Sequence, residues 1–172
     1  MNFALCGFMG CGKTTIGRRV ARAENLEFID IDAEIVKEQG MKITEIFEKH
    51  GEEYFRALEH DMIKRAAKMD NVMISLGGGA VTNPENVQAL RECAKIIYLQ
   101  MSEENIKERL KNNTTRPLLL RPDRDIVLHE LYVKRLPLYN AAASIVVDAN
   151  APYEQVVWTV RTMMQAYMTK LD

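Results

Sequence analysis

Short apolar runs alternate along the chain with longer segments in which apolar residues recur every three or four positions. Continuous apolar runs are typical of strands that are covered on both faces, so they predict buried strands of four to six residues. Five are expected, at Asn2–Cys6, Glu27–Asp30, Asn71–Ser75, Lys95–Gln100 and Ser144–Val147. Helices are expected near 13–24, 33–39, 43–68, 84–94, 103–112 and 125–141, with one more at the end of the chain. This alternation predicts an α/β fold in which helices cover both faces of a parallel sheet.

Three helices carry additional signals. Thr82 and Glu85 have the spacing of a capping box beside Pro84, and Ser102 is placed to cap the helix that begins at residue 103. The last helix has an apolar stripe, which we interpret as core, with a dimer face as the alternative. The stripe consists of Val156, Val157, Val160, Met163, Met164, Tyr167 and Leu171.

Composition narrows the class of protein. The chain has 172 residues, 47% of them hydrophobic and 27% charged, which suits one domain spanning residues 1–172. A net charge of −1 argues against a general nucleic-acid or membrane-surface binder. No apolar run is long enough to span a bilayer, and the N-terminal segment lacks the features of a signal peptide. Three cysteines without zinc-binding spacing suit a reducing compartment, so we expect a cytoplasmic protein. We also expect it to be a monomer.

The strongest chemical signal is a phosphate-binding loop. Gly7-Phe8-Met9-Gly10-Cys11-Gly12-Lys13-Thr14 matches G-x-x-x-x-G-K-[ST] and lies between a predicted strand and a predicted helix. Glycines let backbone N–H groups turn toward phosphate oxygens, and the helix adds its positive end. Lys13 is then expected to reach the β- and γ-phosphates of a nucleotide, and the Thr14 hydroxyl to bind Mg²⁺.

Acidic residues that could assist the metal follow the second strand. Asp30 and Asp32 lie two positions apart, so on an extended chain both side chains would point to one side at the ligand-binding end of the sheet. The alternative is that Asp32 simply caps the following helix, which would account for one of the two acids.

Basic residues concentrate in the second half of the chain. Between Arg109 and Arg135 there are seven Lys or Arg residues and three Asp or Glu residues, which favours an anionic ligand. Arg116 lies in the proline-containing stretch 112–124, which we interpret as a loop able to bring its guanidinium onto a transferring phosphate. Arg56 alone could equally be a surface partner of neighbouring glutamates.

Glycines and isolated side chains complete the set of candidates. Gly77-Gly78-Gly79 follows a strand, where backbone can approach a small molecule closely, although a merely flexible turn is the alternative. Cys6 and Cys11 make a poor metal site without further ligands, and packing is the better interpretation. The histidines are His50, His60 and His129; each stands alone in a helical segment, which favours surface or packing roles.

Taken together, these motifs resemble the shikimate kinases, a family of P-loop proteins related to nucleoside monophosphate kinases. The resemblance extends over nearly the whole chain. The motifs that carry it are GFMGCGKT at 7–14, FIDID at 28–32, EEYFRALE at 52–59, LGGGAV at 76–81, RPLL at 116–119, KRLPLY at 134–139 and VDAN at 147–150.

The resemblance implies a three-layer αβα fold with strand order 2-3-1-4-5, and transfer of the ATP γ-phosphoryl group to the 3-hydroxyl of shikimate. It also implies a substrate-binding region at about 31–60 and a lid at about 112–124. Partners would be shikimate and ATP, with Mg²⁺ as cofactor.

The resemblance also implies roles for individual residues. Lys13, Asp32 and Arg116 would be catalytic, with Asp32 as the base. ATP would be bound by Gly10, Cys11, Gly12, Lys13, Thr14, Thr15, Arg109 and Arg116, and the metal by Thr14 and, through water, by Asp30. Shikimate would be bound by Asp32, Arg56, Gly77, Gly78, Gly79 and Arg135, with Glu59 supporting Arg56. The loop after Val147 would border adenine, where Ala151 replaces the basic residue of some family members.

Two kinds of alternative stay open. Gluconate kinases and nucleoside monophosphate kinases share the phosphate loop, although the pair Arg56 and Arg135 with the glycine run favours a small hydroxy-carboxylate. A non-catalytic effector-binding domain of the same fold is the alternative outside the enzymes.

Overall fold

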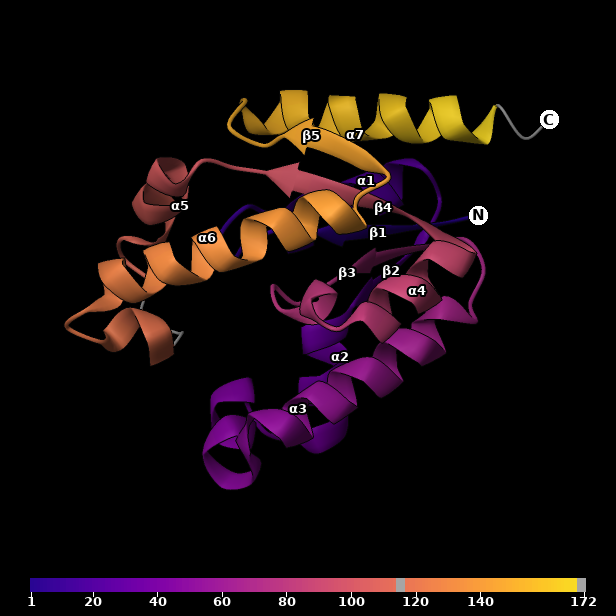
Figure 1. The fold of residues 1–172 in the computed structure, drawn as a ribbon. Helices are drawn as coiled ribbons and strands as arrows, with labels where there is room; N and C mark the ends of the chain where they lie inside the picture. The colour runs from indigo at the N-terminus through magenta and orange to yellow at the C-terminus, as the bar shows by residue number, and fades with distance from the viewer. Residues whose placement is uncertain (114–116, 170–172) are drawn as a thin grey trace.

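Parallel strands form a single sheet at the centre of the molecule (Figure 1). The structure is a computed structural model that describes residues 1–113 and 117–169. Across those residues the sheet has five strands in the order β2-β3-β1-β4-β5, which confirms the expected order. The strands are β1 (Asn2–Cys6), β2 (Glu27–Asp30), β3 (Val72–Ser75), β4 (Ala94–Gln100) and β5 (Ile145–Asp148).

Helices cover both faces of the sheet. On one face α1 packs against β2, β3 and α7, and on the other α4 and α6 pack against β4 (Figure 1). The long helix α3 runs beside α4 and α2 at the β2 side. The helices are α1 (Lys13–Ala23), α2 (Ile31–Gln39), α3 (Ile43–Ala67), α4 (Pro84–Cys93), α5 (Glu103–Leu110), α6 (Arg124–Ala142) and α7 (Tyr153–Met168), with 3₁₀ turns η1 (Ala80–Thr82) and η2 (Pro117–Leu120).

Burial explains why the interior strands are nearly continuous apolar runs. Every residue of β1 and β3 is buried, because each strand has a neighbour on either side and helices above and below. The two edge strands of the described sheet differ. In β2 only Ile29 is buried, and in β5 burial alternates along the strand, so that Val146 is 48% exposed. The prediction of fully buried strands is therefore wrong for Glu27–Asp30 and for Ser144–Val147.

Several helix ends differ from the sequence expectation. The capping residue of α4 is Asn83, whose side chain accepts a hydrogen bond from Glu85 N, while the Thr82 hydroxyl donates to Gly79 O. The predicted capping box of Thr82 and Glu85 is thus wrong. Ser102 caps α5 as expected, accepting from Asn105 N. Inside α3, Gly51 has a non-helical backbone (φ 82°, ψ 172°), so the helix expected at 43–68 is kinked there.

The stripe on α7 is mostly core, as predicted. Val156, Val157, Val160 and Met164 are buried, and Tyr167 packs against the core at partial exposure. Met163 is 41% exposed, because it lies at the edge of the stripe. Leu171 lies outside the described residues. No helix in the described part of the chain is long and apolar enough to cross a membrane.

Candidate active site

The phosphate-binding loop joins β1 to α1 at the carboxyl edge of the sheet, as the sequence predicts. Gly10 and Gly12 have left-handed backbones, with φ of 83° and 97°, a conformation that side chains disfavour. Gly12 precedes α1 without any side-chain cap, so the first N–H groups of the helix are left for a ligand. Lys13 Nζ donates to Gly7 O at 2.8 Å and Phe8 O at 3.1 Å, which holds the ammonium group against the loop.

Cys6 and Cys11 pack around this loop rather than line its cavity. Both thiols are free and buried, and burial raises the pKa of Cys6 to about 12, so that thiol stays protonated at neutral pH. The Cys11 side chain is fully buried and its backbone N–H donates to Phe8 O. Any contact of Cys11 with a nucleotide would therefore come from its backbone.

Asp30 and Asp32 reach the site by a different route from the one predicted. Asp30 ends β2 and caps α2, accepting from Ala33 N at 3.2 Å, while Asp32 lies in the first turn of that helix. The extended-chain geometry was therefore wrong, as was the idea that Asp32 is the cap. Asp30 Oδ2 also accepts a hydrogen bond from the Thr14 hydroxyl at 2.6 Å. Both carboxylates nevertheless border the cavity at the phosphate loop.

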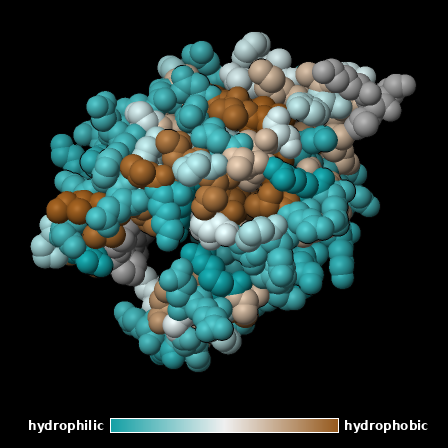
Figure 2. Space-filling view, in the orientation of Figure 1, coloured by the Kyte–Doolittle hydropathy of each residue, from teal (hydrophilic) through white to brown (hydrophobic). Residues whose placement is uncertain are grey.

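Two cavities meet beside Asp32. The first, of about 350 Å³, is lined by the phosphate loop, Thr15, Asp30 and Arg109, whose guanidinium donates to Gly10 O at 3.4 Å. The second, of about 740 Å³, lies between α3, the glycine run and α6, and contains Arg56 and Arg135. Met9, Asp32 and Gly78 line both. The space-filling view shows a notch between the lobe formed by the start of α3 and the end of the molecule where α6 begins (Figure 2).

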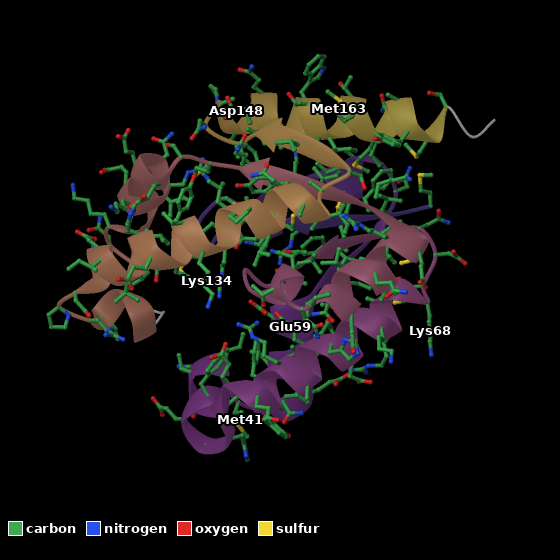
Figure 3. The ribbon with its side chains drawn as sticks, in the orientation of Figure 1. Met41, Glu59, Lys68, Lys134, Asp148 and Met163 are labelled. Carbon is green, nitrogen blue, oxygen red and sulfur yellow. The ribbon has the colours of Figure 1, made fainter. Side chains whose placement is uncertain are left out.

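The second cavity has one charged end and one apolar wall. Phe47 and Phe55 contribute the apolar wall, with their ring centroids 4.9 Å apart. In Figure 3, Glu59 lies between α3 and the underside of α6, where Lys134 also extends. Tyr139 on α6 is buried and donates to Gly78 O at 2.6 Å, which ties α6 to the glycine run.

Arg56 is held at the cavity by two glutamates. Its Nη1 donates to Glu59 Oε2 at 2.7 Å and its Nη2 to Glu52 Oε1 at 3.3 Å. Burial lowers the pKa of Arg56, but the two carboxylates raise it by more, so the guanidinium stays charged. Arg56 and Arg135 both line the second cavity, so two arginines border one pocket. The sequence left Arg56 open between a surface ion pair and a ligand; the structure shows an ion pair that borders the pocket.

The Glu59 side chain is 1% exposed, and within the described residues its Oε1 has no hydrogen-bond partner. Burial raises the pKa of Glu59, with a further contribution from Asp32, and Arg56 and Arg135 oppose the shift. The folded chain therefore binds the Glu59 proton more tightly than the unfolded chain does. Consequently, ionisation of this group costs folding free energy.

We expect the free energy of unfolding of the wild type, compared with that of Glu59→Gln, to decrease as pH rises. It should be highest below about pH 4.5, the ordinary pKa of glutamate, and fall as pH rises through the higher folded-state pKa. Urea unfolding of both proteins at a series of pH values would measure this. A difference that stays constant or grows with pH would contradict the buried, destabilised carboxylate.

Gly77 is required by close approach. A Cβ atom at this position would lie 2.6 Å from Glu59 Oε1 and 2.8 Å from Asp32 Oδ1, so the two carboxylate oxygens converge on one point of the glycine run. At Gly79, an added Cβ would lie 2.6 Å from Arg56 Nη1. These glycines therefore do more than form a flexible turn, because they let the backbone lie close to the charged groups of Asp32, Glu59 and Arg56.

Gly77→Ala should therefore displace Asp32 and Glu59 together. We expect turnover to fall by about 10²-fold, the cost of moving a reacting group by roughly 1 Å. Steady-state kinetics would measure this. Gly40→Ala is the control for backbone strain alone, because Gly40 has a left-handed backbone (φ 63°) but an added Cβ there meets nothing within 4 Å, so this variant should lose stability without losing turnover. Equal activity in Gly77→Ala and the wild type would contradict this packing.

The stretch 112–124 is described except for residues 114–116, so Arg116 lies outside the described residues. The turn η2 shows that part of the stretch expected to be a loop is helical. The loop after β5 is fixed by Asn150, whose Oδ1 accepts from Ser102 N and Asn105 Nδ2. The sequence did not predict that Met9 lines the site, because it occupies a variable position of the loop motif. Nor did it predict the role of Tyr139, although this residue ends the segment KRLPLY that contributed to the resemblance.

His60 and His129 are partly exposed and each contacts a side chain of another helix, in agreement with surface or packing roles. His60 Nδ1 lies 2.6 Å from Asn86 Oδ1, and His129 Nδ1 lies 2.7 Å from Glu103 Oε2, linking α6 to α5. His50 packs against the Tyr54 ring, in agreement with a packing role.

The site offers a metal ion only a few protein ligands among the described residues. Among the described residues no group of three His, Cys, Asp or Glu side chains could hold a metal ion. The hydroxyl of Thr14 and the carboxylate of Asp30 fit Mg²⁺, which usually takes one or two protein oxygens and completes its shell with phosphates and water.

Known proteins confirm the resemblance. The family model for shikimate kinase matches residues 9–165. The chain belongs to the shikimate kinase family. A shikimate kinase of Caldicellulosiruptor bescii is 49% identical over 139 residues, which cover 81% of either protein. One of Bordetella pertussis is 42% identical over 167 residues, 96% of this chain and 79% of that protein.

A solved structure of the shikimate kinase family shares the whole fold. The shikimate kinase from Acinetobacter baumannii, determined in complex with shikimate, superposes with a TM-score of 0.90 at 31% sequence identity, over 98% of this chain and 93% of that chain. The chain is therefore an ATP-dependent phosphotransferase with a P-loop kinase fold.

Proposed function

We propose that this protein transfers the γ-phosphoryl group of ATP to the 3-hydroxyl of shikimate, giving shikimate 3-phosphate and ADP. The observation that carries the proposal is the position of Asp32, which borders both the phosphate-loop cavity and the cavity of the two arginines. A hydroxyl placed between these cavities would lie near both the Asp32 carboxylate and a phosphate bound in the loop. Membership of the shikimate kinase family supports the choice of acceptor.

The arginine cavity supplies recognition of the acceptor. Arg56 and Arg135 can bind a carboxylate with charge-assisted, bidentate hydrogen bonds, which fix the orientation of the ring that carries it. The apolar wall of Phe47 and Phe55 suits the carbon face of such a ring. Gly77, Gly78 and Gly79 let the backbone close over it.

The phosphate loop supplies the nucleotide site. Lys13 is placed to move from the loop carbonyls to the β- and γ-phosphates, and Arg109 lies over the same cavity. Thr14 and Asp30 would hold Mg²⁺, which would neutralise charge on the phosphates when bound. Arg116 would add a guanidinium to the transferring group from the lid.

Asp32 is the base that accepts the proton of the acceptor hydroxyl. In a loose phosphoryl transfer the acceptor hydroxyl loses its proton late, so the carboxylate first orients the hydroxyl and then accepts the proton. Alignment and charge stabilisation contribute most of the rate acceleration.

Asp30→Asn should weaken the metal site. We expect the concentration of Mg²⁺ needed for half-maximal activity to rise by about tenfold, because an amide binds this cation less strongly than a carboxylate. Activity measured across Mg²⁺ concentrations would test this, and removal of the metal with EDTA should abolish turnover in both proteins. An unchanged Mg²⁺ requirement would remove Asp30 from the metal site.

Turnover with alternative acceptors tests the proposed function. ADP release coupled to NADH oxidation would be measured with shikimate, gluconate and nucleoside monophosphates at equal concentration. We expect shikimate to exceed the others by at least 10²-fold. Nucleoside monophosphates lack a carboxylate for the two arginines, and the open chain of gluconate does not hold its hydroxyls at a fixed distance from its carboxylate as a ring does. Preference for another acceptor would refute the assignment, and shikimate binding without turnover would favour the effector-binding alternative.

The remaining expectations concern organisation. A single kinase domain with substrate-binding region 31–60 and lid 112–124, a monomeric state and a cytoplasmic location stay predictions from the sequence. Sedimentation of the purified chain and fractionation of the source cells would test the last two.

A further inference from the structure

A buried amide connects α3 to the turn that follows the glycine run. Asn86 on α4 is 1% exposed, although it is neither apolar nor part of the site described above. Its Nδ2 donates to Ala80 O at 2.9 Å, and its Oδ1 lies 2.6 Å from His60 Nδ1 on α3. A buried amide of this kind is retained only where its hydrogen bonds are satisfied, and here both bonds lead toward the shikimate pocket.

The direction of these bonds follows from the chemistry of the groups. Because the NH₂ group of Asn86 binds a carbonyl, its oxygen faces His60, so His60 must carry a proton on Nδ1 and donate it. The other ring nitrogen, Nε2, lies 3.4 Å from Glu85 Oε2, a side chain that is largely exposed. The bridge therefore runs from His60 through Asn86 to Ala80.

Each end of the bridge is next to a residue that contacts Arg56. His60 follows Glu59, which holds Arg56, and Ala80 follows Gly79, over which the Arg56 guanidinium lies. Ala80 N also donates to Gly77 O, and Thr82 donates to Gly79 O through both its backbone N–H and its hydroxyl. The turn η1 and the glycine run thus form one hydrogen-bonded unit.

We propose that Asn86 and His60 are positioning residues for the carboxylate-binding arginine of this enzyme. The bridge fixes the distance between α3 and the glycine run, and that distance determines where the Arg56 guanidinium lies. Neither residue touches the pocket, so they act through Arg56 and the glycine backbone. The inference rests on the proposed function, because it concerns the same acceptor site.

Loss of the bridge should weaken the binding of shikimate but not that of MgATP. Loss of the bridge lets α3 move relative to the glycine run, while the phosphate loop, which belongs to β1 and α1, keeps its own contacts. We therefore expect Asn86→Ala and His60→Ala each to raise KM for shikimate by about tenfold, below the roughly 10²-fold that a 1 Å misplacement can cost. KM for MgATP should stay within about twofold.

A conservative variant separates the hydrogen bond from packing. His60→Asn keeps an N–H donor at the position of ring Nδ1, so it should restore KM for shikimate to within about twofold of the wild type. The double variant of His60→Ala and Asn86→Ala should be no worse than the poorer single variant, because both remove the same bridge.

Asn2 provides a matched control. It is a buried asparagine with two hydrogen bonds, to Met69 O and from Val72 N, at the amino end of the sheet and away from the pocket. Asn2→Ala should lower the melting temperature as Asn86→Ala does, without changing KM for shikimate. If Asn86→Ala unfolds, His60→Ala tests the same bridge, since its side chain is partly exposed.

The experiment is steady-state kinetics of these variants against shikimate and MgATP, with thermal unfolding alongside. A selective rise in KM for shikimate, with rescue by His60→Asn, supports the bridge. An active wild type with equal KM in all variants, or a rise shared by Asn2→Ala, overturns this inference alone. A wild type that neither binds nor phosphorylates shikimate overturns the proposed function and this inference with it.

Discussion

Asp32→Asn should lower kcat by about 10²- to 10⁴-fold, the usual contribution of a positioned general base. An amide can still orient the acceptor hydroxyl by accepting its hydrogen bond, but it cannot take up the proton. KM for shikimate should therefore change little. Stopped-time assays of ADP release at saturating shikimate and MgATP would measure the loss.

Two controls make this result specific. Asp125→Asn removes one carboxylate whose side chain is 70% exposed on α6, and it should leave kcat unchanged. The melting temperature of Asp32→Asn should stay close to that of the wild type, because the asparagine has nearly the same shape. Turnover of Asp32→Asn at the wild-type rate would remove Asp32 from the role of base.

Arg56→Ala should lose both substrate affinity and stability. Removing a charged donor from a carboxylate raises KM for shikimate by roughly 10²-fold. It also leaves the buried Glu59 carboxylate without its partner, which should lower the free energy of unfolding by about 2 kcal/mol, since Arg56 itself is partly exposed. Steady-state kinetics and urea unfolding at pH 7 would measure the two losses.

A second substitution separates these two losses. Adding Glu59→Gln to Arg56→Ala removes the uncompensated buried charge, so we expect stability to recover while KM for shikimate stays high. Arg65→Ala is the matched control, because Arg65 lies on the same helix and pairs with Glu38 at the surface. It should leave KM for shikimate unchanged. Recovery of KM in the double variant would show that Arg56 acts only by neutralising Glu59.

The fold could be predicted because its signals are local. Strands buried on both faces appear as continuous apolar runs, and helices appear as apolar positions at helical spacing. The edge strand β5 has the same apolar composition, yet burial alternates along it and Val146 is 48% exposed. Composition alone could not reveal its place in the sheet.

The site could be predicted as a set of residues but not as a geometry. Asp30 and Asp32 were selected by their spacing on an extended chain, yet a helix begins between them and both still reach the cavity. Met9 lies at an unconstrained position of the loop motif. The bridge of Asn86 had no sequence signal, because one asparagine in an amphipathic helix is ordinary until its burial is known.

The convergence of two cavities at Asp32 is tested most directly by a crystal structure of the protein with ADP, Mg²⁺ and shikimate. We predict that the shikimate carboxylate lies between Arg56 and Arg135, and that the 3-hydroxyl lies within hydrogen-bond distance of Asp32 on the side facing the phosphate loop. A carboxylate bound elsewhere, or a ring whose 3-hydroxyl points away from the nucleotide, would contradict the account.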